Sequence, residues 1–252
     1  EAGNFFLEPD IKVSDYFWTH PAQVGYAGLE LKRSMLPWPE NSRRHGLFVV
    51  TADEIEEESN SMFCKVKGEI KKITFSGILK KLSGRMGQVS APYLVIFTIT
   101  DAVSDGFFQP MNVFVVPVHS KSLLVPVDSS YERKVLSKLL QALPYWKKCG
   151  AEVRIKKPLF DTVVHTQEGE KSIMPDFLIS ANGKKIILEV SGSHEVEYLE
   201  RKNRTHALMA EFGTLINFDA CEAEKNGNWQ QALNFLFRDI TRLVVPIGGK
   251  HG

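Results

Sequence analysis

Asp176 and Glu189 are the two residues whose types and spacing point most directly to chemistry. If the strands that carry them pair as argued below, the two carboxylates face each other on one surface of a sheet. Side chains directly opposite have Cβ atoms about 4.5–5.5 Å apart, and like charges at that separation are destabilising. A hard cation such as Mg²⁺ resolves the conflict, because it takes carboxylate oxygens together with waters and phosphates. The acids therefore predict a metal site; a slipped register, or one acid on a solvated edge strand, is the structural alternative.

The turn that would position these acids is the pair Asn182 and Gly183. It separates two apolar runs rich in β-forming residues, 172–180 and 184–191. Asn-Gly between two such runs is a strong hairpin signal, because both turn residues must adopt positive φ. Counting outward from the turn places the two acids directly opposite each other.

The motif formed by Pro175 and Asp176, a gap, and Glu189 at the end of an apolar strand resembles that of the PD-(D/E)xK nuclease superfamily, which has the restriction-endonuclease-like fold. The resemblance implies that the two acids hold Mg²⁺, or alternatively Mn²⁺, and that the substrate is DNA. The family motif has a lysine two residues after the glutamate, where this chain has Ser191. Some members carry that lysine on the following helix, and Lys202 is the candidate here.

Glu132 is a third acid of interest. Asp128, Ser129 and Ser130 provide N-cap chemistry for a helix over residues 131–143, and Glu132 shares the apolar stripe of that helix. An acid in a first turn is favoured by the helix dipole alone. The family resemblance gives the alternative, in which a glutamate on the first core helix adds to the metal site.

The remaining C-terminal elements follow from periodicity. Strands are predicted at 153–155, 172–180, 184–191 and 214–218, with a polar connection at 162–170 and helices at 131–143, 195–212 and 229–243. Tyr198, Lys202, His206 and Met209 share one side of the second helix. The order resembles the nuclease core, and the tract 127–202 is also similar to uncharacterised proteins of plasmids and mobile elements.

Residues 1–126 predict a β-rich N-terminal module without recognisable catalytic residues. Strands are expected at 47–51, within 63–82, at 92–100 as a central strand, and at 111–118 and 123–127, with an exposed helix or loop at 53–58. The module carries a basic series at Lys65, Lys67, Lys71, Lys72, Lys80, Lys81 and Arg85. These charges could neutralise phosphates, or they could simply solvate one side of a sheet.

Composition sets wider limits. A chain of 252 residues with 43% hydrophobic content can bury one large core or two small ones, and its net charge of +1 neither requires nor excludes DNA binding. Its three cysteines are widely spaced and predict no zinc site or disulfide framework. No apolar run approaches the roughly 20 residues of a membrane span, and no signal-peptide pattern is present. We therefore expect a cytoplasmic protein.

The sequence thus predicts an α/β protein with a restriction-endonuclease-like core at 127–245, a mixed sheet flanked by helices, and a disordered tail at 246–252. The hypothesis is a Mg²⁺-dependent DNA endonuclease of a mobile element or of defence against foreign DNA. Asp176, Glu189 and the carbonyl of Val190 would hold the metal, and Lys202 would orient the attacking water. A degenerate nuclease fold that binds DNA or a partner protein without cleavage is the alternative, and a homodimer stays open.

Overall fold

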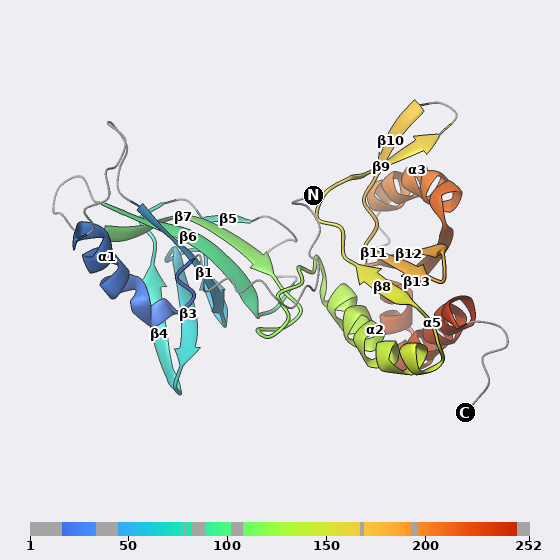
Figure 1. The fold of residues 1–252 in the computed structure, drawn as a ribbon, viewed down its shortest axis with the longest axis horizontal. Helices are drawn as coiled ribbons and strands as arrows, with labels where there is room; N and C mark the ends of the chain where they lie inside the picture. Colours follow the sequence, from blue (N-terminus) through green and yellow to red (C-terminus); the bar gives the residue numbers. More distant parts are fainter. Residues whose placement is uncertain are drawn as a thin grey trace. The chain divides into compact units, whose positions relative to one another are not determined.

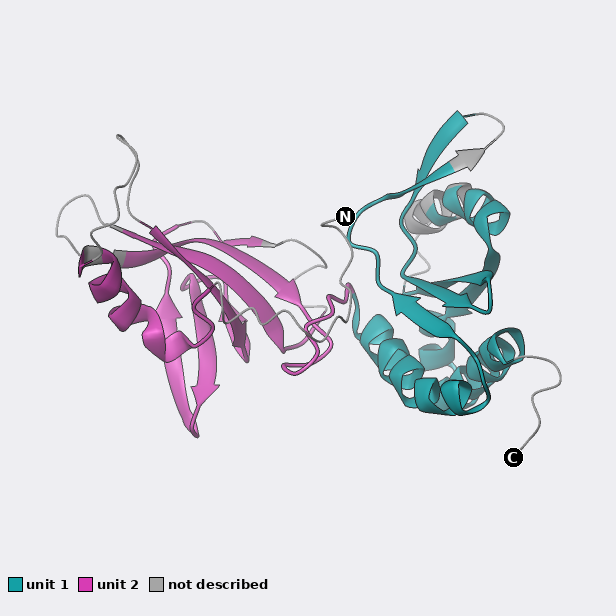
Figure 2. Cartoon of the chain, in the orientation of Figure 1, with its two compact units in different colours: residues 1–7, 129–252 teal, residues 8–128 magenta. Residues whose placement is uncertain are grey.

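The computed structural model of the chain describes residues 17–33, 45–77, 79–81, 89–101, 108–166, 169–192 and 196–245. The chain divides between Asp128 and Ser129 into two compact units (Figure 2). The predicted fold class is confirmed, because a β-rich segment precedes a sheet flanked by helices (Figure 1). The predicted tail at 246–252 lies outside the described residues. Within those residues, no helix is both long enough and apolar enough to cross a membrane.

The N-terminal unit, magenta in Figure 2, contains two sheets. The larger has the strand order β1 (His45–Ala52), β6 (Tyr93–Asp101), β7 (Phe108–Pro117) and β5 (Leu79–Lys81). The smaller has the order β2 (Glu54–Glu56), β3 (Ser61–Val66) and β4 (Glu69–Thr74). A short 3₁₀ turn, η2 (Pro21–Gln23), leads into α1 (Val24–Arg33). As predicted, the apolar run that forms β6 is a central strand, paired on both sides.

Aromatic packing marks the core of this unit, where Phe48 and Phe97 stack with their ring centroids 4.9 Å apart. Two expectations for the unit were wrong. The acidic run at 53–58 contributes a strand, β2, because Glu54–Glu56 pairs with β3 instead of standing alone. Residues 123–127 form no strand and make only an isolated bridge between Val118 and Pro126.

The C-terminal unit, teal in Figure 2, has a four-stranded mixed sheet. Its strand order is β13 (Thr214–Asp219), β12 (Lys184–Ser191), β11 (Phe177–Ala181) and β8 (Val153–Lys156). The β12 and β13 strands are parallel, while β11 is antiparallel to both of its neighbours. A separate two-stranded ribbon consists of β9 (Thr162–Thr166) and β10 (Gly169–Ile173).

Helices cover both faces of this sheet (Figure 1). The helices are α2 (Ser130–Lys148), α3 (Val196–Phe212), α4 (Ala220–Lys225) and α5 (Trp229–Val244). On one face α2 and α5 meet, with Trp146 stacked on Phe237 and donating to Thr241 Oγ1 at 2.9 Å. On the other face Met209 of α3 packs in one apolar cluster with Ile187 of β12 and Leu178 of β11. Side chains at alternate positions from Ile187 and Leu178 therefore point toward α3.

The hairpin was predicted correctly. Asn182 and Gly183 have φ of 50° and 78°, and Ala181 pairs with Lys184 as counted from the turn. Asn182 also anchors the turn through its amide, which accepts from the Glu152 backbone N–H at 3.0 Å and donates to a carbonyl of α5. These bonds tie the turn to Glu152, just before β8, and to the end of α5. A shift of the hairpin register by one residue would break both of them.

Several element boundaries differ from the predictions. The run 172–180 is broken at 174–176, because β10 pairs with β9 and only β11 belongs to the main sheet. The supposed polar connection at 162–170 is consequently mostly strand. Helix α2 continues past Pro144 to Lys148, and α4 was not anticipated at all. In the first case β9 and β10 are consecutive strands that form a hairpin, and the sequence between them, Gln167 and Glu168, lacks the Asn-Gly signal that marked the next turn.

Candidate functional site

The two predicted acids lie side by side at the α3-facing surface of the sheet. Asp176 immediately precedes β11, and Glu189 is its register partner near the end of β12. The backbone N–H of Asp176 donates to Glu189 Oε1 at 3.0 Å, and the N–H of Val190 donates to Asp176 Oδ2 at 2.7 Å. Each carboxylate is therefore held by the backbone of the other strand. The prediction that the two acids are neighbours is confirmed, and the alternatives of a slipped register or separate faces are wrong.

Lys202 of α3 lies between these carboxylates. Its ammonium is 2.7 Å from Glu189 Oε2 and 3.4 Å from Asp176 Oδ2, and it donates to the Val190 carbonyl at 3.3 Å. The Lys202 side chain is 13% exposed, against 18% for Asp176 and 3% for Glu189. Three oxygen atoms that the sequence predicts as metal ligands thus converge on one positively charged nitrogen.

Burial alters the ionisation of this cluster. Loss of solvent raises the pKa of Glu189, and the charge of Asp176 raises it further, while the Lys202 ammonium and the Asp176 backbone N–H act in the opposite direction. A carboxylate with a raised pKa needs a cation to stay ionised inside the fold. The electrostatics of the site therefore favour a positive charge at the point where the oxygens meet.

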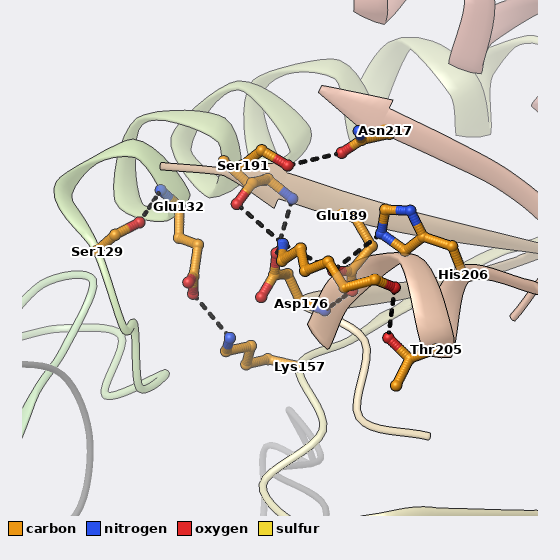
Figure 3. Close-up of polar contacts among 11 residues, drawn as sticks. Ser129, Glu132, Lys157, Asp176, Glu189, Ser191, Thr205, His206 and Asn217 are labelled. Carbon is orange, nitrogen blue, oxygen red and sulfur yellow. Dashed lines mark hydrogen bonds and ion pairs between the residues drawn. The ribbon is translucent and has the colours of Figure 1, made fainter. Parts of the chain in front are cut away.

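His206 lies one turn after Lys202, and Figure 3 shows its ring beside Glu189. Its Nε2 is 3.9 Å from Glu189 Oε2 and has no hydrogen-bond partner among the described residues. Burial lowers the pKa of His206, and the neighbouring Lys202 charge lowers it further. The imidazole is therefore neutral at physiological pH. The sequence placed His206 on the same helix side as Lys202, where it could contact a DNA backbone, but it gave no reason to assign this residue a catalytic role.

Glu132 is held by a different cation. Its carboxylate accepts from Lys157 Nζ at 2.7 Å, and both side chains are almost fully buried at 5% and 4% exposure (Figure 3). Ser129 caps α2 by accepting from the Glu132 backbone N–H at 3.0 Å, as the sequence predicted. The Lys157 ammonium also lies 5.5 Å from the ring centroid of Phe177, the residue after Asp176. Glu132 therefore faces the core and forms a buried ion pair near Asp176 and Glu189 (Figure 3). It is not a solvated residue of the first helical turn.

Lys157 was missed by the sequence analysis. It follows β8 directly, and a lysine after a strand is commonly solvated, so its type and position gave no useful signal. Its partner comes from a helix 25 positions earlier in the chain, and the pairing depends on how α2 packs beside the sheet.

Ser191 occupies the position at which the family motif has a lysine. Ser191 is 3% exposed, and its hydroxyl donates to Asn217 Oδ1 of β13 at 2.9 Å. Figure 3 shows this pair at the top of the view, above Asp176 and Glu189. The side chains of Arg201 and Arg204, which flank Lys202 in the sequence, lie outside those that the structure describes.

Comparison with known proteins adds three findings. Residues 128–242 match the family described as a restriction endonuclease-like C-terminal domain. Residues 1–118 match a domain of unknown function, DUF8535. The chain is also 32% identical over 136 residues to an "Uncharacterized protein in cib 5'region" of Escherichia coli; the match covers 51% of this chain and 62% of that protein.

The family match covers the helices and strands that carry Glu132, Asp176, Glu189 and Lys202. It agrees with the resemblance drawn from the motif and with the mixed sheet flanked by helices. Residues 128–242 of this chain are therefore similar to the restriction endonuclease-like C-terminal domain family, in sequence and in the arrangement of their sheet and helices.

Proposed function

We propose that the C-terminal domain is a metal-dependent DNA endonuclease. The observation that carries the proposal is the convergence of Asp176 Oδ2, Glu189 Oε2 and the Val190 carbonyl on a single point, where Lys202 places its charge. Two carboxylates and a carbonyl are a donor set of hard oxygens, which suits Mg²⁺ and also Mn²⁺. The described residues therefore fit the ion that the fold family implies.

In this proposal Asp176, Glu189 and the Val190 carbonyl hold the cation. Such a cation, when bound, acidifies a water molecule and offsets negative charge on the scissile phosphate. The hydrogen bonds from the Asp176 and Val190 N–H groups fix both carboxylates before any ligand arrives. This preorganisation avoids reorganisation during the reaction, which is where much of the electrostatic benefit arises.

Lys202 and Glu132 have supporting roles in the proposal. The Lys202 ammonium, on a flexible stem beside both acids, can orient the attacking water or stabilise charge on the phosphate. Glu132, which Lys157 holds near the two acids, would contribute a further carboxylate to the polar environment. The resemblance of the tract 127–202 to proteins of plasmids and mobile elements supports a role linked to a mobile element or to defence against foreign DNA.

A second candidate is a nuclease fold that binds DNA or a partner protein without cutting. Two observations favour it: a hydrogen-bonded serine at position 191, where the family motif has a lysine, and an internal ammonium that already neutralises the acids. In that case DNA affinity would rise as salt falls, because phosphate contacts release counterions, but no product would form.

The test uses the full chain with supercoiled plasmid DNA and Mg²⁺ or Mn²⁺, beside an Asp176→Ala variant. We expect nicking or linearisation by the native chain, none by the variant, and none by either protein in EDTA. Equal cleavage by both proteins would mean that a contaminant or another site is responsible. Salt-dependent binding with no cleavage by the native chain would favour the second candidate.

A further inference from the structure

The ammonium of Lys202 occupies the point where the proposed metal ligands meet. Of its contacts, the shortest is 2.7 Å to Glu189 Oε2, the oxygen of the most buried acid, and the Asp176 and Val190 oxygens follow at 3.4 and 3.3 Å. We infer that Lys202 is a built-in counter-cation that must give up this position to a divalent ion, so that the lysine sets how tightly the metal binds. The inference rests on the proposed function, since it concerns the same ligands.

The electrostatic argument begins with the two carboxylates. They lie against each other's backbone in a largely buried place, and two like charges so close cannot both stay ionised without a cation nearby. In the structure that cation is Lys202, whose side chain is itself mostly buried. The ammonium is thus a structural replacement for the charge that a metal would bring.

The geometric argument is that one place cannot hold both cations. Mg²⁺ binds oxygen at about 2.0–2.1 Å, so an ion held by Glu189 Oε2, Asp176 Oδ2 and the Val190 carbonyl on the side that Lys202 Nζ occupies would lie within van der Waals distance of that nitrogen. Repulsion between a divalent ion and an ammonium at that separation is large when both are shielded from water. The lysine must therefore swing aside, which its four-carbon stem allows.

The consequence is a competition that can be measured without DNA. When Lys202 moves away from Glu189 and Asp176, its ion pairs with them are lost. This loss reduces the net free energy that metal binding releases. Removing the charge should therefore strengthen metal binding, whereas removing a residue that merely assisted the metal would weaken it or leave it unchanged. The same change should leave the metal-free protein less stable, because two buried acids lose their cation.

The experiment titrates the EDTA-treated full chain with Mn²⁺, followed by calorimetry and by the electron paramagnetic resonance signal of free Mn²⁺. The variants are Lys202→Met and Lys202→Gln, which remove the charge, and Lys202→Arg, which keeps it. Lys147→Met, an exposed lysine of α2, is the control for the change in net charge. Thermal unfolding of each protein is recorded with and without Mn²⁺.

We expect Lys202→Met and Lys202→Gln to bind Mn²⁺ on the order of tenfold more tightly than the native chain or more. Their metal-free forms should unfold at a lower temperature, and Mn²⁺ should raise that temperature by more than it does for the native protein. Lys202→Arg and Lys147→Met should not gain affinity. If Lys202→Met does not fold, Lys202→Gln provides the same test.

The outcomes separate this inference from the proposed function. Equal or weaker Mn²⁺ binding by both neutral variants, with clear binding by the native chain, would overturn the competition and leave the metal site in place. Binding by the neutral variants alone would support the competition and count against metal-dependent cleavage by the native protein. If no protein binds Mn²⁺ at millimolar concentration, the inference and the proposed function both fail.

Discussion

Asp176 and Glu189 are joined by two hydrogen bonds, each from a backbone N–H on one side of the hairpin to the carboxylate on the other. The Asp176 N–H donates to Glu189 Oε1 at 3.0 Å, and Asp176 Oδ2 accepts from the N–H that follows Glu189 at 2.7 Å. The two acids therefore cannot move independently. Any change to one side chain alters the position of the other, and this link underlies the predictions below.

Asp176→Asn should abolish cleavage and leave the fold intact. The amide oxygen can still accept from the Val190 N–H, so the strand pairing is retained, but the negative charge that the proposed metal needs is lost. We expect plasmid cleavage to fall on the order of a hundredfold or more, with an unfolding temperature close to that of the native protein. A variant that still cleaves at the native rate would remove Asp176 from the reaction.

The stability of the metal-free protein should depend on pH through Glu189. Its ordinary pKa is 4.5, and burial together with the Asp176 charge raises the pKa in the folded state. The folded protein then holds this proton more tightly than the unfolded chain does. The contribution is therefore complete below the ordinary value and is lost as the pH rises through the raised pKa.

The measurement compares the native chain with Glu189→Gln in EDTA, by urea unfolding from about pH 4 to pH 7. The glutamine cannot titrate, so the difference in free energy of unfolding, native minus variant, should decrease across this range. A difference that stays level or increases with pH would show that Lys202 outweighs burial and that the pKa of Glu189 is not raised.

The turn at Asn182 should be sensitive to two separable effects. Asn182→Ala loses two hydrogen bonds to the backbone and places alanine at positive φ, whereas Asn182→Gly loses only the hydrogen bonds. We expect a loss of about 2–3 kcal/mol for alanine and about 1 kcal/mol less than that for glycine. Chemical denaturation measures both. Equal losses would mean that the side-chain bonds alone matter.

The buried pair of Glu132 and Lys157 should behave as one unit. Both side chains are almost fully buried, so removing either partner takes away the opposite charge that lies 2.7 Å from the other. Glu132→Gln or Lys157→Met alone should cost about 3 kcal/mol, while the double variant should cost clearly less than the sum. Additive losses in a double-mutant cycle would show that the two groups are not coupled.

Glu132→Gln also tests the proposed contribution of this acid to the reaction. A folded variant with native cleavage would confine Glu132 to stability. A loss of cleavage greater than that of Lys157→Met, at matched unfolding temperatures, would support a role for the carboxylate itself.

Moving the lysine back to the family position tests Lys202. We expect Lys202→Met to lower cleavage on the order of a hundredfold even though it binds metal more tightly. Position 191 lies on the same face of β12 as Glu189, so the double variant Ser191→Lys with Lys202→Met should recover part of the activity. Ser191→Ala, which only removes the hydrogen bond to Asn217, is the control. Unchanged cleavage by Lys202→Met would exclude the lysine from the reaction.

Much of the site could be predicted because the strands that carry its acids are positioned by a turn close to them in the sequence. The Asn182 and Gly183 turn specifies the register of β11 and β12 by its own conformational demands, and this register alone puts Asp176 opposite Glu189. Helix starts were equally local, since the Ser129 cap sits three residues from the N–H that it binds. The break at 174–176 was missed because β10 pairs with β9 in a hairpin whose connection, Gln167 and Glu168, carries no strong turn signal.

The sequence by itself determined the hairpin, the facing acids, and the approximate positions of α2, α3 and α5, because turn chemistry and periodicity act over a few residues. Only the tertiary structure decided that Lys202 reaches the oxygens of Asp176 and Glu189, and that Lys157 pairs with Glu132. These contacts join residues 13 to 26 positions apart that come together only when helices pack on the sheet. The charge balance of the site therefore depends on how the helices pack, whereas the register of its two strands depends on the local sequence.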